Sequence, residues 1–298
     1  MSQYVDIKSI SALHHLYGIA RPAHPLITRI DLQQVHRHKL EPDTLYRLGF
    51  YTIFYKHLKG TLPYGKSRYD FEEGTLMFTA PNQVVAPTLD SPAVEGWGLC
   101  FHPDLLNRTH LGRTINSYSF FQYESNEGLH LSDEEKMILT DCINTIHREY
   151  SRPVDKHTEP LIINQLDSLL TYCDRFYDRQ FITRAKVNKD IVQRFEALLT
   201  NYFSQDLTEA GLPDVKYFAS RVNLSPNYLS DVLHRYTGKT TQEHIHLKLI
   251  ETAKSLLWST EKPISEIAYE LGFAHPSHFT KLFKIKTGQT PLAYRQAS

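Results

Sequence analysis

The sequence predicts an α+β protein of two domains: an antiparallel β-barrel with flanking helices, then an all-α domain in which two helix–turn–helix units are joined by a long helix. Three observations support this fold class. The chain has 298 residues, enough for two domains of about 100 to 200 residues each. Its first third holds short strand-like runs separated by turns. Its last 110 residues contain one helical pattern twice.

The composition excludes several classes of protein. The 33 Lys and Arg residues balance 33 Asp and Glu residues, so a nucleic-acid surface on this chain must be a local patch. No apolar run approaches the roughly 18 residues that cross a bilayer, which excludes membrane insertion. The first 25 residues lack an apolar signal core and a cleavage site, so we expect a cytoplasmic protein. Cys100, Cys142 and Cys173 lack C-x-x-C spacing and are expected to be buried free thiols.

Strand-like runs fill the first part of the chain. They are short, rich in β-branched and aromatic residues, and bounded by turn residues. The clearest runs are Leu45–Tyr55, Gly74–Phe78 and Val94–Phe101, with turns at Gly60, Pro63–Gly65, Pro81–Asn82 and Ser91–Pro92. This pattern predicts antiparallel strands that close into a small barrel.

Two amphipathic stretches follow the strands. Ser132 and Glu135 form a capping box ahead of apolar residues at helical spacing, which predicts a helix over 133–150. A second stretch predicts a helix over 158–180, and the polar segment after it is typical of a short linker. We therefore expect an N-terminal domain over 1–182 (β part about 26–120, helical part about 131–180), a linker over 183–188 and a C-terminal domain over 189–298.

One helical pattern occurs twice in the C-terminal domain. Each copy has two apolar stripes at i, i+3, i+4 spacing, separated by a short turn. The stripes are Val215, Phe218, Ala219 and Val222 with Leu229, Val232, Leu233 and Tyr236, and then Ile264, Ile267, Ala268 and Leu271 with Phe279, Leu282 and Phe283. The closing segments Thr237–Thr240 and Thr287–Thr290 also match, and the second turn is one residue longer.

Each copy has the signals of a helix–turn–helix unit, whose second helix enters a DNA major groove. Ser225 can cap a helix that begins at Pro226, and His275 precedes Pro276 in the same way. The helix over Gln242–Trp258 between the copies spans about 25 Å. With the width of the units added, it can present both second helices to groove segments about 34 Å apart. After the second turn the chain has no acidic residue but four cations, Lys281, Lys284, Lys286 and Arg295, which suits phosphate contact.

With these motifs, residues 189–298 resemble the DNA-binding domain of the AraC/XylS family of bacterial transcription regulators. The matching motifs are Ile264-x-x-Ile267-Ala268-x-x-x-Leu271-Gly272-Phe273, Ser277-x-Phe279-x-x-x-Phe283-Lys284, Thr287-Gly288-x-Thr290-Pro291-x-x-Tyr294-Arg295 and, in the first unit, Ser225–Ser230 with Thr237–Gly238. Two residues depart from the family pattern: Lys248 replaces an arginine in the connecting helix, and Asp231 stands where a basic or polar residue often faces DNA.

The resemblance implies which side chains face DNA. They are Asn227, Ser230, Asp231 and His234 in the first unit, and Ser277, His278, Thr280, Lys281 and Lys284 in the second. Asn and Lys suit adenine and guanine edges, and Asp accepts from the cytosine amino group or repels phosphate. The alternative for each residue is a solvated helix surface. Tyr228 and Arg235 instead suit packing and backbone contact.

The N-terminal half resembles the cupin-like barrel that often binds a small effector in this family, beside helices that form a dimer. The resemblance lies in Phe71-x-x-Gly74-x-Leu76-x-Phe78-x-x-Pro81 and Gly96-Trp97-x-Leu99-x-Phe101-His102-Pro103. Candidate effector-binding residues are Phe50, Tyr55, Phe78 and Trp97, although aromatic residues at alternate strand positions are more often core.

These features favour a sequence-specific transcription regulator, with double-stranded DNA, a second copy of the chain, a small-molecule effector and RNA polymerase as expected partners. Family habit favours activation. One alternative is a cupin-type metalloenzyme fused to a DNA-binding domain, because His36, His38 and Glu41 supply part of a metal motif. The other elements of that motif are missing, so we expect no catalytic residue, metal or cofactor, and no enzyme activity. A third hypothesis is an effector-independent regulator that uses its N-terminal half for dimerisation.

Overall fold

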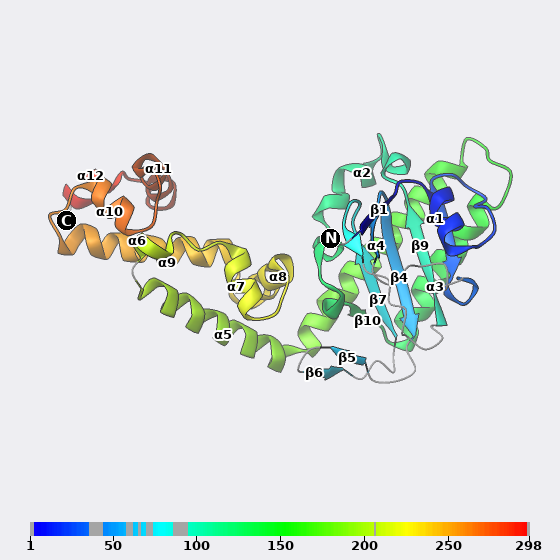
Figure 1. The fold of residues 1–298 in the computed structure, drawn as a ribbon, viewed down its shortest axis with the longest axis horizontal. Coiled ribbons are helices and arrows are strands. Elements are labelled where there is room, and N and C mark those ends of the chain that lie inside the picture. The colour runs from blue at the N-terminus through cyan, green and yellow to red at the C-terminus, as the bar shows by residue number, and fades with distance from the viewer. Residues whose placement is uncertain are drawn as a thin grey trace. The chain divides into compact units, whose positions relative to one another are not determined.

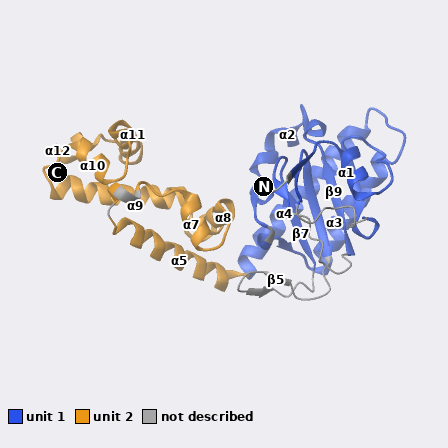
Figure 2. Cartoon of the chain, in the orientation of Figure 1, with its two compact units in different colours: residues 1–183 blue, residues 184–298 orange. Residues whose placement is uncertain are grey.

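The computed structural model describes residues 3–35, 44–57, 62–64, 67–69, 74–85, 95–205 and 207–296. The chain divides into two compact units, Met1–Thr183 (unit 1) and Arg184–Ser298 (unit 2), as Figure 2 shows. The fold is α+β, with the sheets in unit 1 and a helical unit 2. No helix within the described residues combines the length and the apolar character of a membrane span.

Unit 1 is built on a five-stranded antiparallel sheet in the order β10-β7-β4-β9-β2 (Figure 1). Its strands are β2 Ile27–Asp31, β4 Tyr51–His57, β7 Thr75–Thr79, β9 Glu95–Phe101 and β10 Leu129–His130. A second sheet holds β1 Gln3–Ile7, β3 Thr44–Leu48 and β8 Val84–Val85, and a short ribbon pairs β5 Leu62–Tyr64 with β6 Ser67–Tyr69.

One strand pair departs from the expected antiparallel pattern. β1 runs parallel to β3. A parallel pair needs a crossover connection, and here helix α1 (Ile10–Tyr17) lies in the chain between the two strands. β1 precedes the region in which the sequence predicts strands, so this pairing was not foreseen.

The two faces of the five-stranded sheet contact different layers. Because side chains alternate along a strand, Ile30 and Cys100 lie on one face and join a core with α1 and with Leu48 and Phe50. Arg29, Ile53 and Leu99 occupy the other face. Helix α3 (Asp133–Tyr150) contacts β2, and helix α4 (Thr158–Thr183) packs on α3 and contacts β10.

The helices of unit 1 follow the sequence prediction closely. The backbone N–H of Glu135 donates to the Ser132 hydroxyl at 3.3 Å, and the Glu135 carboxylate accepts the Ser132 backbone N–H at 3.0 Å, which confirms the predicted capping box. The predicted helix over 133–150 is confirmed as α3, and α4 extends the second prediction by three residues. Short helical segments between β9 and α3 are Pro103–Leu106, His110–Thr114 (α2), Ile115–Ser117, Ser119–Gln122 and Ser125–Glu127.

Unit 2 contains the helices of the repeated pattern. They are α5 Ala185–Phe203, α6 Leu207–Ala210, α7 Val215–Arg221, α8 Pro226–Thr237, α9 Thr241–Ser259, α10 Ile264–Glu270, α11 Pro276–Thr287 and α12 Pro291–Gln296. Within this unit, α7 and α8 lie near one end of α9, and α10, α11 and α12 near the other (Figure 1).

The segment that resembles a linker in the sequence is helical from Ala185 onward. Ala185 and Lys186 are good helix formers, and Asn188 is buried although it is polar. The linker prediction was therefore wrong about local structure, because polarity alone does not distinguish a loop from the first turns of an amphipathic helix.

Helix α9 carries the core that joins the two helix pairs. Ile245, Leu249, Ala253 and Leu257 are buried at four-residue intervals along it. They pack in one cluster with Phe218, Leu229 and Leu233 of the first pair and with Ile267, Phe279 and Phe283 of the second.

Candidate nucleic-acid interface

The first helix pair, α7 and α8, is positioned by two capping side chains and a left-handed turn. The Asp214 carboxylate accepts the Tyr217 N–H at 2.7 Å, and the Ser225 hydroxyl accepts the Tyr228 N–H at 3.2 Å. Asn223 in the turn has φ of 57°, a conformation that asparagine tolerates better than most residues. These residues end α7 and start α8 within a few positions.

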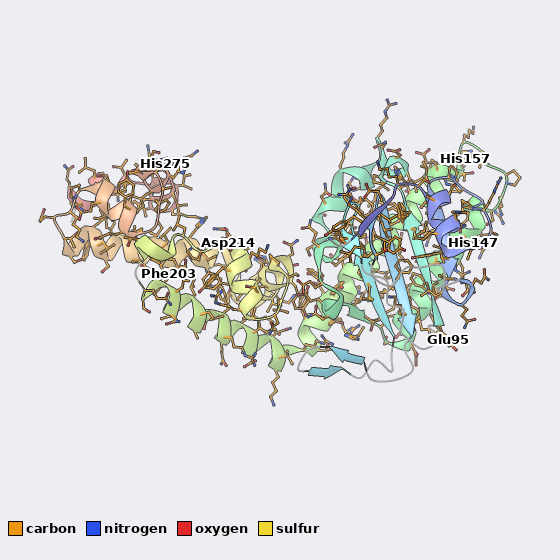
Figure 3. All side chains as sticks on the ribbon, viewed as in Figure 1. Glu95, His147, His157, Phe203, Asp214 and His275 are labelled. Carbon is orange, nitrogen blue, oxygen red and sulfur yellow. The ribbon has the colours of Figure 1, made fainter. Side chains whose placement is uncertain are left out.

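The second pair, α10 and α11, repeats that turn with different residues. Gly272 stands at the position of Asn223 and has φ of 82°. The Phe273 N–H donates to the Ala268 carbonyl at 3.0 Å, as the Leu224 N–H does to the Ala219 carbonyl at 3.0 Å. His275, labelled with Asp214 in Figure 3, precedes α11 but makes no capping hydrogen bond with its side chain.

Both second helices end in the same hydrogen-bonded closure. Gly238 and Gly288 are left-handed, and their N–H groups donate to the carbonyls of His234 and Lys284 at 2.8 and 2.9 Å. Thr237 and Thr287 donate their hydroxyls to carbonyls one turn back at 2.7 and 2.8 Å. The sequence repeat is therefore a repeat of backbone geometry.

The outward face of α8 contains three of the four residues predicted for it. His234 is exposed and Asn227 and Asp231 are half-buried, on the side of the helix away from buried Leu229 and Val232. Ser230 lies nearer α9, because its hydroxyl donates to the buried Thr241 hydroxyl at 3.1 Å. Of the neighbours expected to serve packing and backbone contact, Tyr228 is buried and Arg235 is exposed.

The outward face of α11 is exposed at the equivalent positions. Ser277, His278, Lys281 and Lys284 are all exposed, and Phe279 and Phe283 are buried behind them. The Thr280 hydroxyl donates to the Pro276 carbonyl at 3.1 Å, so its donor is occupied. Thr280 corresponds to Ser230, and both hydroxyls are committed within the protein.

Positive charge gathers on α11 and near the start of α9. The Thr240 backbone N–H that donates to Glu243 is the largest cause of the lowered pKa of that carboxylate, and the charges of Lys286 and His234 lower it further. Burial, followed by the charge of Lys286, lowers the pKa of His246. Lys248, one of the departures from the family pattern, pairs with Glu251 at 3.4 Å.

The candidate effector residues do not form one group. Tyr55 and Trp97 line a cleft in unit 1 with their rings stacked at 5.8 Å. Phe78 packs with Phe120 at 4.5 Å, and Phe50 belongs to the core around α1. The sequence analysis missed Arg29 and Lys136, which also line this cleft and which no sequence motif marks.

The partial metal motif cannot be placed. His36, His38 and Glu41 lie outside the described residues.

Comparisons with known proteins agree with this geometry. A family model described as a helix-turn-helix domain matches residues 218–297. The uncharacterized HTH-type transcriptional regulator YijO of Escherichia coli is 23% identical over 192 residues, 64% of each chain. The bifunctional transcriptional activator/DNA repair enzyme AdaA of Bacillus subtilis is 35% identical over 101 residues, 34% of this chain and 47% of that protein. The chain thus spans less than two thirds of the length of each of these two relatives.

A solved structure shares the C-terminal part. The C-terminal domain of AraT, a response regulator from Geobacillus stearothermophilus, is 31% identical and covers 36% of this chain and 85% of that one, with a TM-score of 0.33. From the family match and the curated relatives, unit 2 contains a helix-turn-helix domain of DNA-binding transcription regulators. The match and these relatives support the AraC/XylS family of transcription regulators for this C-terminal domain.

Proposed function

We propose that the chain is a sequence-specific transcription regulator whose two helix pairs act as two helix–turn–helix units on successive major-groove segments. The observation that carries the proposal is the matched geometry of α8 and α11. Three equivalent positions lie on the outward face of each helix, 227, 231 and 234 in α8 and 277, 281 and 284 in α11, and the opposite face is buried. All three are exposed in α11, whereas in α8 position 234 is exposed and 227 and 231 are half-buried. The 19 residues of α9 span about 28 Å between the pairs, and groove segments on one face of B-DNA are about 34 Å apart.

In this proposal the central outward residues contact base edges. Asn227 suits adenine, Asp231 accepts from a cytosine amino group, and Lys281 and Lys284 suit guanine or phosphate. His234, Ser277 and His278 flank these contacts. Ser230 and Thr280 contribute through the oxygen lone pairs left by their internal hydrogen bonds.

Unit 1 is proposed as the regulatory half. Its two sheets support a cupin-like effector domain, and its paired helices α3 and α4 suit dimerisation. The expected outcome is activation through contact with RNA polymerase in the cytoplasm, where the protein meets DNA. Support for this half of the proposal comes from the family resemblance.

The proposal is tested by footprinting the full chain on DNA upstream of its own gene at low and high salt. We expect two protected major-groove segments about one helical turn apart, with protection lost at high salt because phosphate contacts dominate affinity. A chain ending at residue 183 is the control and should protect nothing. Absence of protection at either salt, with and without cell extract as a source of effector, would contradict the proposal.

A further inference from the structure

We propose that the cleft in unit 1 between the sheet and α3 binds a small organic carboxylate, held by Arg29, Lys136 and Trp97. The inference deepens the proposed function, since this ligand is then the effector; only its regulatory role rests on that proposal. The cleft is about 380 Å³, a size suited to a small molecule.

The strand register assembles the floor of the cleft. Asp31, Trp97 and Tyr55 are directly paired neighbours on β2, β9 and β4, so their side chains lie in one row on the face toward the helices. Arg29 lies two residues before Asp31 on the same face, and α3 adds Lys136 and Thr140. Strands and a helix distant in sequence thus contribute to one site.

Two buried donors in the cleft have no acceptor among the described residues. The Arg29 Nε and the Trp97 Nε1 are buried and make no hydrogen bond within the part of the chain that the structure describes. Both atoms can only donate, and a buried donor without an acceptor destabilises a fold. A ligand oxygen satisfies them. The Tyr55 hydroxyl also lacks a partner among the residues that the structure describes, but it lies against Gly74, so Tyr55 contributes its ring rather than its hydroxyl.

The charges favour a negative ligand at the end of the cleft that contains Arg29. Among the described residues, neither Arg29 nor Lys136 has an ion-pair partner, and after burial the charge of Arg29 is the next cause that lowers the pKa of His147. Asp31 already accepts the Gln33 backbone N–H at 3.0 Å. Glu95 is exposed at the outer end of β9 (Figure 3). Arg29 is paired with Leu99, four residues along β9 from Glu95. A ligand carboxylate at Arg29 is therefore separated from the negative charge of Glu95.

The aromatic residues suit the body of the ligand. Tyr55 and Trp97 stack on each other, and the Lys136 ammonium lies 5.5 Å from the centre of the Tyr55 ring. A planar or short apolar group packs beside this stack while its carboxylate accepts from Arg29 and Lys136. A ligand that combines acceptor oxygens with apolar surface therefore matches the cleft better than a cationic ligand.

The binding test uses the emission of Trp97 as its signal. Trp97 and Trp258 are the tryptophans of the chain, and Trp258 is 69% exposed on α9, so Trp258→Phe in the full-length protein leaves Trp97 as the reporter. Benzoate is titrated against its neutral counterpart benzamide, and acetate against acetamide. We expect saturable changes with a carboxylate, and affinity lower by about tenfold or more for its amide, because the charge-assisted bonds are lost.

Variants assign the signal to the cleft. Arg29→Gln and, independently, Lys136→Gln should each weaken carboxylate binding by about tenfold. Arg152→Gln, at an exposed position just after the end of α3, should not. Lys136 is half-exposed, so its variant keeps the test valid if Arg29→Gln fails to fold. Three results would overturn the inference: equal binding of a carboxylate and its amide, no response to either carboxylate, or unchanged carboxylate affinity in both cleft variants.

Failure of this inference is distinguishable from failure of the proposed function. The titration needs no DNA, and the footprint needs no carboxylate. Protection of DNA with no carboxylate response removes the ligand assignment alone. Carboxylate binding without protection of DNA would support the ligand assignment and contradict the proposed function as a transcription regulator.

Discussion

The first and second helix pairs of unit 2 share one backbone and differ in what they expose. Equivalent hydrogen bonds stand at the turn and at the closure of both pairs. At the three outward positions, however, α8 carries Asn227, Asp231 and His234, whereas α11 carries Ser277, Lys281 and Lys284. Residues that fix the turn and the core are thus constrained by geometry, and the outward face varies in charge. In the proposed function, α8 therefore contributes mainly base contacts, and α11 adds the lysines that suit guanine or phosphate.

The turns of the two pairs tolerate substitution differently. Both turn residues are left-handed, but a Cβ on Gly272 would lie 2.7 Å from the Gly211 carbonyl carbon and 3.0 Å from the Leu212 nitrogen. These are backbone atoms, which cannot rotate away. The second pair therefore depends on a glycine where the first accepts an asparagine.

The largest effect is expected from a substitution in the turn between α10 and α11. Gly272→Ala should lower the free energy of unfolding of unit 2 by about 3 kcal/mol, because it adds a steric clash to an unfavourable backbone conformation. Asn223→Ala should cost about 1 kcal/mol, since only the conformation is unfavourable there. Urea unfolding with hydrogen exchange of α10 and α11 amides measures both. Equal losses in the two variants would show that the contact with Gly211 does not constrain the turn.

The next effect concerns the charge difference between α8 and α11. Lys281→Ala should lower the slope of log affinity against log salt by about one and weaken operator binding. Asp231→Ala should instead raise affinity for random DNA, because a carboxylate facing phosphate is removed. Fluorescence anisotropy at several salt concentrations measures both, with exposed Lys186→Ala on α5 as the control. If Asp231→Ala weakens random-sequence binding, the assigned division between the two helices is wrong.

A third comparison concerns the starts of α8 and α11. Ser225→Ala should cost about 1 kcal/mol, because the Tyr228 N–H loses its acceptor. His275→Ala should have almost no effect on stability, since the His275 side chain accepts no such bond. Thermal unfolding of the two variants measures the difference. A larger loss from His275→Ala would mean that the histidine stabilises α11 by contacts other than capping.

Local signals made much of unit 2 predictable from the sequence. The apolar stripes, Ser225, Gly238 and Gly288 each act within one turn of a helix, so spacing alone locates them. Polarity gave the wrong prediction at Ala185–Asn188. The helix there is stabilised by a buried face that extends over the whole of α5, and a stretch of six residues does not show it. The parallel pairing of β1 with β3 depends on a crossover between distant segments. Arg29 and Lys136 lie far apart in sequence, and only the packing of α3 on β2 places them in one cleft.

The smallest expected effect sharpens the comparison at the end of each pair. Thr240 and Glu243 form a full capping box at the start of α9, whereas Thr290 caps α12 by accepting the N–H of Ala293, which has no carboxylate to return the bond.

Hydrogen bonds from Thr240 lower the pKa of Glu243 in the folded protein, so its contribution to stability is present above the ordinary carboxyl pKa and is lost as pH falls through the lowered value. Glu243→Gln should therefore reduce protection of the first α9 amides at neutral pH and change it little in acid, as hydrogen exchange at the two pH values can measure. Conversely, Ala293→Glu should increase protection of α12 at neutral pH by completing the second box. A Glu243→Gln effect of equal size in acid would mean that its packing, rather than its charge-assisted hydrogen bonds, supports α9.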